Sequence, residues 1–198
     1  MSRYAAPVIA PIVEGKGEQE AIGVLIRKIA AVQGTYVDVA PPFRVDSAKM
    51  RKPEELKRAI LVQSARVPGN GGVLIVRDGD DKDVDCVVEL AAELASTVTQ
   101  VGAIAEVVIA APEFEAWILA SIDTVGSHRL ISDTTPILDP ESRRDAKGRL
   151  RAVMSESYRE TIHQAAFAQL IDVGRASQRS RSFRRLVHAV ESLATERR

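Results

Sequence analysis

The stretch Val73-Leu74-Ile75-Val76-Arg77-Asp78-Gly79-Asp80 decides the fold of this chain. Four apolar, mostly β-branched residues follow the Gly-rich turn at residues 69–72, so the run predicts a buried strand. Carboxylates begin where the run stops, which places them at the carboxyl end of that strand. In open α/β sheets ligands bind at that edge, so the position of these acids points to function.

The spacing of Asp78 and Asp80 favours a bound cation. On an extended backbone both side chains point to the same side, because side chains alternate with a period of two. Two charges about 4 Å apart then repel by about 4 kcal/mol at an effective dielectric near 20. Mg²⁺ or Mn²⁺ removes that cost and prefers oxygen ligands. The alternative is a solvated acidic loop that caps the next helix, which Asp81, Asp83 or Asp85 does alone.

Acids follow two other apolar runs in the same way. Residues 7–13 read as the first strand, and Glu14 and Glu18 follow it. Glu18 lies in the first turn of the helix that comes next. Residues 107–111 read as another strand, which Pro112 ends before a second pair. Strand ends in a parallel sheet share one edge, so we expect these side chains to gather there. The acids expected at this edge are Glu14, Glu18, Asp78, Asp80, Glu113 and Glu115.

The rest of the chain predicts further strands and helices. Residues 35–45 suggest a strand that is broken at Pro41-Pro42, and Pro53 opens a helix. Helical spacing predicts a buried face on the helix after the central strand, made of Val84, Val87, Val88, Ala91, Ala95 and Val98. From Arg149 onward the chain looks helical, with apolar faces at Ile162, Ala166 and Leu170 and at Phe183, Leu186, Val187, Val190 and Ala194.

This order predicts an α/β fold with a mostly parallel four-stranded sheet flanked by helices. Residues 1–122 form the expected core, and residues 123–198 form an insertion loop and a basic helical part packed on it, within a single domain. We expect Trp117 in the core and Cys86 in the core or at its boundary. The histidines share no metal-binding spacing, so we expect them at the surface or boundary: His128, His163 and His188.

The net charge is zero, but its distribution is uneven. Residues 1–141 hold 14 Lys and Arg against 21 Asp and Glu, and residues 142–198 hold 13 against 6, so the two parts carry −7 and +7. An acidic part that holds metal and a basic part that holds a polyanion suit an enzyme acting on nucleic acid. A solvated helical face is the alternative. No apolar run approaches the roughly 20 residues that span a bilayer, so we expect a cytoplasmic protein without membrane contact.

A basic, hydroxyl-rich segment lies between two of the C-terminal helices. Arginine and hydroxyl side chains are the usual phosphate contacts, although a mobile surface loop would have a similar composition. The residues predicted to contact nucleic acid are Lys16, Lys82, Arg175, Arg179, Arg181 and Arg184.

In this order of elements the chain resembles the Toprim superfamily, and within it an uncharacterised group related to the nuclease domains of OLD-type proteins. The motifs are Val13-Glu14-Gly15 with Glu18, Asp78-Gly79-Asp80 and Glu113-Phe114-Glu115-Ala116-Trp117. Looser marks follow toward the C-terminus: Lys147, Tyr158, Asp172 and Ser182-Phe183. The superfamily often has Gly where this chain has Asp83, which adds a ligand or indicates a different site.

The resemblance implies a Toprim-like (Rossmann-like) sheet whose acidic edge holds one or two Mg²⁺ or Mn²⁺ ions for phosphodiester chemistry. It makes Glu14 a metal ligand or general acid/base and makes Asp78 and Asp80 metal ligands. Glu18 and one of Glu113 and Glu115 would then help at a second metal. Lys147, like Lys16 and Lys82, is a candidate for stabilising charge on the phosphate.

The leading hypothesis is a metal-dependent nuclease that acts on DNA or RNA, working alone or as the Toprim subunit of a system with a separate ATPase. The chain has no Walker motif, so ATP would have to be used by a partner protein. Two ions about 4 Å apart activate water and stabilise the leaving oxygen without a side-chain nucleophile.

Several alternatives remain at this stage. A Toprim-like subunit that lost its chemistry would bind no metal. A HAD-like phosphatase also has Asp-x-Asp after a strand, but Lys82 stands where Thr or Val is expected. A topoisomerase would need a further domain with a Tyr nucleophile, and a primase would need a Cys/His zinc cluster. An EF-hand calcium loop is excluded, because Lys82 and Asp83 stand where that pattern has an Asp or Asn and a Gly.

Overall fold

A computed structural model describes residues 6–80, 84 and 86–195 of the chain. Five strands form one sheet, and every strand pair in it is parallel. The strand order is β2-β1-β4-β5, and β3 pairs with β1 beyond the end of β2. The strands are β1 (Val8–Val13), β2 (Asp38–Val39), β3 (Phe43–Arg44), β4 (Gly71–Asp78) and β5 (Ala105–Ala110). The α/β class and the parallel sheet are therefore confirmed.

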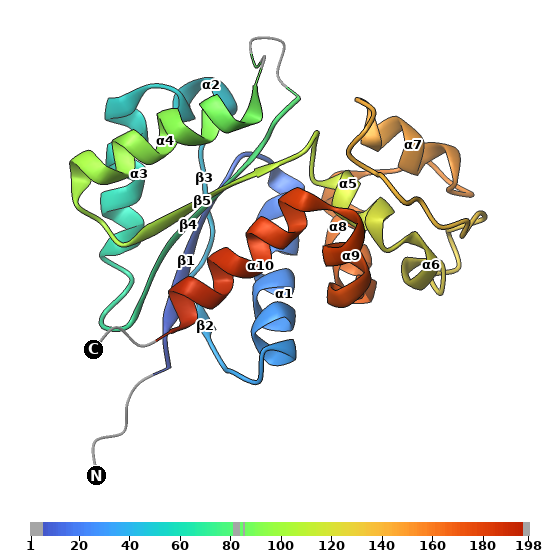
Figure 1. The fold of residues 1–198 in the computed structure, drawn as a ribbon, viewed down its shortest axis with the longest axis horizontal. Helices are drawn as coiled ribbons and strands as arrows, with labels where there is room; N and C mark the ends of the chain where they lie inside the picture. The colour runs from blue at the N-terminus through green and yellow to red at the C-terminus, as the bar shows by residue number, and fades with distance from the viewer. Residues whose placement is uncertain (1–5, 81–83, 85, 196–198) are drawn as a thin grey trace.

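Helices cover both faces of this sheet (Figure 1). Figure 1 shows α2, α3 and α4 on one face, α1 and α10 on the other, and α5 to α9 grouped beyond the carboxyl end of β5. The helices are α1 (Lys16–Val32), α2 (Ser47–Met50), α3 (Pro53–Ser64), α4 (Val87–Val101), α5 (Glu115–Ala120), α6 (Ile122–Val125), α7 (Ala146–Ala152), α8 (Glu160–Leu170), α9 (Val173–Arg179) and α10 (Arg181–Ala194). None of these helices is long and apolar enough to cross a membrane in the part of the chain that is described.

The sheet separates two apolar cores. The larger core lies between the sheet and α1 and α10, and it contains Val76, Trp117 and Phe183. The smaller core lies under α3 and α4 and contains Ile75 and Leu90. Neighbouring residues of β4 therefore face different cores, as the alternation of side chains along a strand requires. Trp117, fully buried in α5, confirms the prediction for that residue.

The predicted number of strands was wrong. Residues 35–45 form two short strands, β2 and β3, because prolines interrupt the pairing with β1 at residues 41–42. Each segment pairs with its own end of β1, at Val8 and Ile9 and at Ile12 and Val13.

The predicted core faces of two helices hold only in part. Val84 and Val98 are buried as predicted, and Val87, Ala91 and Leu170 pack against a core. In α4 the buried residues include Leu90 and Leu94, whereas Val88 is 71% exposed. The helix is apolar on more than one side, and its larger leucines occupy the core. In α8 Ile162 is 53% exposed and His163 is buried, so the surface or boundary position predicted for His163 was wrong. Polar contacts between α8 and the neighbouring helices decide its orientation.

Candidate metal site at the carboxyl ends of three strands

The carboxyl ends of β1, β4 and β5 meet at one edge of the sheet. Ile12 lies beside Ile75, and Asp78 lies beside Ala110, so the three neighbouring strands end at nearly the same level. Charges from all three segments act on one carboxylate, Asp78. The groups that act on it are Glu18, Glu115, Glu14 and Asp80. The structure thus brings five of the six predicted acids into one electrostatic cluster, which we call the acidic cluster.

Asp78 is held by backbone groups at the end of β5. Its Oδ1 accepts a hydrogen bond of 2.8 Å from the backbone N–H of Phe114. The N–H of Gly79 points to the same turn and donates to the carbonyls of Ala110 and Pro112. Burial and the charges of Glu18 and Glu115 raise the pKa of Asp78 well above its usual range. The carboxylate is therefore fixed in a place where a negative charge is poorly tolerated.

Glu18 joins the cluster from the first turn of α1. Its Oε2 accepts hydrogen bonds from the backbone N–H groups of Glu14 (3.0 Å) and Gly15 (3.2 Å), which fixes the turn after β1. The side chain is only 3% exposed. Burial raises the pKa of Glu18 to about 7, although the two backbone hydrogen bonds oppose the rise. Glu18 therefore both shapes the turn and adds an acid to the cluster.

Glu115 reaches the cluster from the start of α5 and is fully buried. Its Oε1 accepts hydrogen bonds from the Tyr158 hydroxyl (2.7 Å) and from Nε2 of Gln164 (3.0 Å). Its Oε2 is buried and accepts no hydrogen bond from the described residues. Burial raises the pKa of Glu115, while the charge of Lys147 lowers it in part. One buried oxygen of this carboxylate is thus left without a donor.

Glu113 takes a different position from Glu115. Its Oε1 accepts a hydrogen bond of 2.7 Å from the backbone N–H of Lys147, and its Oε2 lies 3.7 Å from the Lys147 ammonium. The same ammonium lies 2.7 Å from Oε1 of Glu160. Burial by itself would lower the pKa of Lys147, but the hydrogen bond to Glu160 and the surrounding carboxylates raise it. The Lys147 ammonium therefore lies between two carboxylates, an arrangement that suits charge stabilisation.

The sequence pattern missed the role of Arg77, which precedes Asp78 in β4. Its side chain is 1% exposed, and its Nε lies 3.8 Å from Oε2 of Glu14. Buried charges are costly unless they are paired, so a fully buried guanidinium needs nearby carboxylates such as Glu14. A positive charge in an otherwise apolar strand was the available signal. Arg77 gives the acidic cluster a fixed internal cation.

The contacts from α8 and from the segment just before it were also missed. Tyr158 and Gln164 bind Glu115 from 43 and 49 residues away in the chain, so no local pattern links them. Burial and the charge of Glu115 raise the pKa of Tyr158, which keeps its hydroxyl a hydrogen-bond donor.

The predicted nucleic-acid contacts are spread over different surroundings. Arg175 and Arg179 both pair with Asp123, and Arg184 donates to carbonyls of α9. Lys16 is exposed in the first turn of α1. Arg181 is exposed at the start of α10. Lys82 lies outside the described residues, as do the acids at positions 81, 83 and 85.

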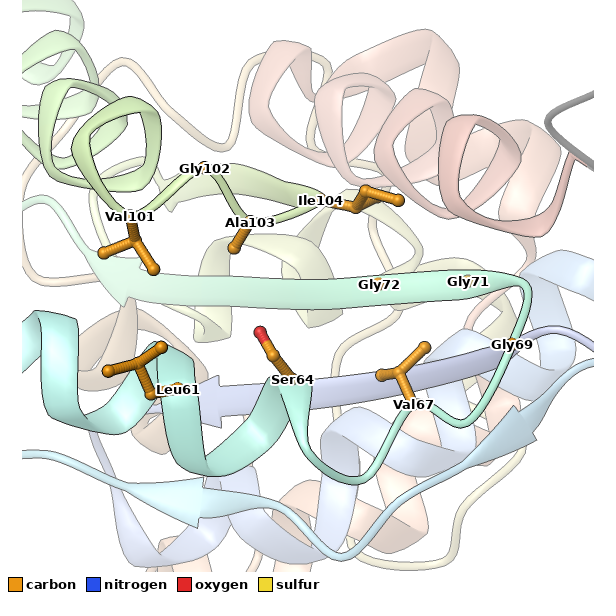
Figure 2. Close-up of a pocket in the computed structure, with 10 residues that line it drawn as sticks. All are labelled: Leu61, Ser64, Val67, Gly69, Gly71, Gly72, Val101, Gly102, Ala103 and Ile104. Atoms are coloured by element: carbon orange, nitrogen blue, oxygen red, sulfur yellow. The ribbon is translucent and has the colours of Figure 1, made fainter.

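The donor chemistry of the acidic cluster fits Mg²⁺ or Mn²⁺, since it offers carboxylate oxygens and a buried Oε2 of Glu115 without a donor. Among residues 6–80, 84 and 86–195, however, no three Asp, Glu, His or Cys side chains already stand as a finished ligand set. A cation bound here would have to draw these carboxylates together. Figure 2 shows a pocket of about 290 Å³ at the opposite end of β4, lined by Gly71 and Gly72, which contains none of these acids.

Gly17 allows α1 to approach α8 closely enough to build the acidic cluster. A Cβ at this position would lie 2.2 Å from Oε1 of Gln164 and 2.8 Å from Cβ of Glu160. Overpacking a core destabilises a protein by up to about 3 kcal/mol in the usual case. Alanine favours a helix over glycine by about 1 kcal/mol, which offsets part of that cost. We therefore expect Gly17→Ala to lower the free energy of unfolding by about 2 kcal/mol in urea denaturation. Gly69→Ala, where a Cβ meets open space, is the control, and an equal loss in both variants would contradict this packing role.

Comparison with known proteins gives a family and a distant structural likeness. A family model described as "Domain of unknown function (DUF4276)" matches residues 13–191. No curated protein matches the chain. A solved structure of the C-terminal region of the Burkholderia pseudomallei OLD protein is similar with 14% identity and a TM-score of 0.48, over 97% of this chain and 100% of that one. A likeness at this level says nothing about activity.

Proposed function

The chain belongs to the DUF4276 family, and starting from that membership we propose that it is a divalent-metal-dependent nuclease with a Toprim-like site. The family description carries no activity, so the support comes from the acidic cluster. Burial and carboxylates from the ends of β1, β4 and β5 raise the pKa of Asp78, which supports a site where negative charges gather. Mutual repulsion of buried acids is costly unless a cation offsets it.

Each group of the cluster has a role in this proposal. Asp78, Asp80 and Glu14 would hold the first Mg²⁺ or Mn²⁺, and Glu18 and Glu115 would complete a second position. When bound, such ions activate water and stabilise the leaving oxygen of a phosphodiester. The Lys147 ammonium, kept protonated by its carboxylate neighbours, would stabilise charge on the phosphate.

Two further parts of the proposal concern partners. The substrate is a polynucleotide, DNA or RNA, and any step driven by ATP would come from a separate ATPase. The basic part of the chain, residues 142–198 with a charge of +7, supports a polyanionic substrate.

A cleavage assay with Mn²⁺ or Mg²⁺ on DNA and RNA tests this function. We expect Asp78→Asn to lower the rate about 100-fold or more, because the metal supplies several kcal/mol of transition-state stabilisation. Glu20→Gln is a matched control, since Glu20 is exposed on α1, the helix that carries Glu18. The assay should include a small phosphomonoester. Equal cleavage by wild type and Asp78→Asn, or no metal binding by wild type, would instead favour a subunit that has the fold without the chemistry.

A further inference from the structure

Two adjoining hollows lie along β5, the edge strand of the sheet. The first, of about 430 Å³, begins at Gly79 and Pro112, directly beside the end of β4. The second, of about 470 Å³, follows β5 between α4 and α10. Both include Ala111 and Arg181, so they form one continuous groove, which we call the β5 groove. One end of the β5 groove therefore opens at the residue between Asp78 and Asp80.

The walls of the β5 groove differ in chemistry. The α4 wall is apolar, and its Val88 is 71% exposed with Ala91 beside it in the groove. The opposite wall includes Arg144 and Arg181, which are both exposed. Neither arginine forms an ion pair with any residue that the structure describes. The groove thus has one face for apolar groups and one for anions.

Most other charges in the groove are already engaged. Oε1 of Glu141 accepts hydrogen bonds from the side chains of Ser180 and Ser182 and from the backbone N–H of Ser182. Arg185 pairs with Glu106 at 2.6 Å. Asp139 and Glu141 both keep a negative charge, because hydrogen bonds from hydroxyl and amide groups do not neutralise a carboxylate. The charged lining residues are therefore three arginines and two carboxylates, and Arg144 and Arg181 are the two arginines without an ion pair among the described residues.

We infer that the β5 groove receives a single polynucleotide strand, with Arg144 and Arg181 on its phosphates and the apolar α4 wall against its bases. This inference rests on the proposed nuclease function and gives its substrate a path to Asp78. A single strand exposes both its phosphates and its base faces, which matches the two walls. A duplex keeps its bases stacked inside and would present only phosphates.

Most of the arginines that the sequence predicted as nucleic-acid contacts are already bound to other groups of the protein. Arg175 and Arg179 already neutralise Asp123, and Arg184 is held by the carbonyls of Ser177 and Gln178. Arg181 is the one of these four that lines the groove, and Arg144 joins it from the segment before α7. The binding charge then comes from two segments that flank the same opening.

Strand binding can be measured without catalysis. Fluorescence anisotropy of short labelled single strands of DNA and RNA in EDTA, over a series of KCl concentrations, gives affinity and its salt dependence. We expect Arg144→Ala/Arg181→Ala to bind about tenfold more weakly or worse. We also expect the slope of log K against log salt to fall by about 1.4, at about 0.7 per phosphate contact on a single strand. Unlabelled duplex should compete less well than single strand.

Arg129→Ala/Arg159→Ala is the matched control. Both arginines are exposed, line neither hollow, and their loss changes the net charge equally. Three results would each overturn the groove assignment. The groove variant could keep the wild-type affinity and salt slope, the control could lose as much as the groove variant, or duplex could bind more strongly than single strand. Metal-dependent cleavage that Asp78→Asn abolishes would still support the proposed function in that case, so the two failures are distinguishable.

Discussion

Between pH 4.5 and about 7, the metal-free protein should lose about 3 kcal/mol of its free energy of unfolding. In this window the unfolded chain releases the proton of Glu18, whereas the folded protein, where burial raises the pKa to about 7, still holds it. The folded state then binds more protons than the unfolded state, so stability falls as pH rises. The raised pKa values of Asp78 and Glu115 act in the same direction.

Urea denaturation in EDTA over this pH window measures the effect. Glu18→Gln should flatten much of the pH dependence, because a glutamine oxygen still accepts the hydrogen bonds from Glu14 and Gly15 but has no charge to lose. Added Mn²⁺ should restore stability at the upper end of the window, since it binds the ionised carboxylates. A stability that rises from pH 4.5 to 7 in EDTA would contradict the buried repulsion described here.

Replacing Arg77 by methionine should lower the free energy of unfolding by about 3 kcal/mol. This is the lower end of the range for breaking a buried ion pair, because the partner Glu14 keeps 23% exposure and contact with water. The loss also removes the internal cation of the acidic cluster and leaves its carboxylates to repel one another more strongly. Methionine fills much of the arginine volume, so an empty cavity is not the main cause.

A double-mutant cycle with Glu14→Gln separates this charge effect from packing. If Arg77 and Glu14 act as a pair, the double variant should lose less stability than the sum of the single variants, by about 1 to 3 kcal/mol. Arg58→Met is the control, since that side chain is 77% exposed in an ion pair within α3, and we expect a change below about 0.5 kcal/mol. Additive losses at Arg77 and Glu14 would show that the guanidinium is held by other groups.

The strand ends and their acids were predictable because both signals are local. An apolar run followed at once by carboxylates appears at Glu14, Asp78 and Glu113, and a parallel sheet brings such ends to one edge. The number of strands was not predictable in the same way. Pro41 and Pro42 signal an interruption, but only pairing with β1 decides that strands form on both sides of it.

The contacts that hold each acid in place could not be predicted from the sequence. Glu113 and Glu115 look equivalent in the sequence. In the structure, however, Glu113 pairs with Lys147, and Glu115 is bound by Tyr158 and Gln164. These partners come from segments more than 30 residues away, where no periodic pattern marks them. The buried face of α8 mixes His163 and Gln164 with Phe167 and Ala168, so a search for apolar faces pointed to Ile162 instead.

The position of α10 has a consequence for how the chain folds during synthesis. This helix, the last one described, covers β1, β4 and β5 and packs on α1, and it buries Phe183, Leu186, Val190 and Leu193. Domains tend to fold as units once their chain has emerged from the ribosome. The part of this sheet face that α1 does not cover therefore remains open until residue 194 has left the exit tunnel. A ribosome that stalls before residue 181 would present that apolar part to chaperones.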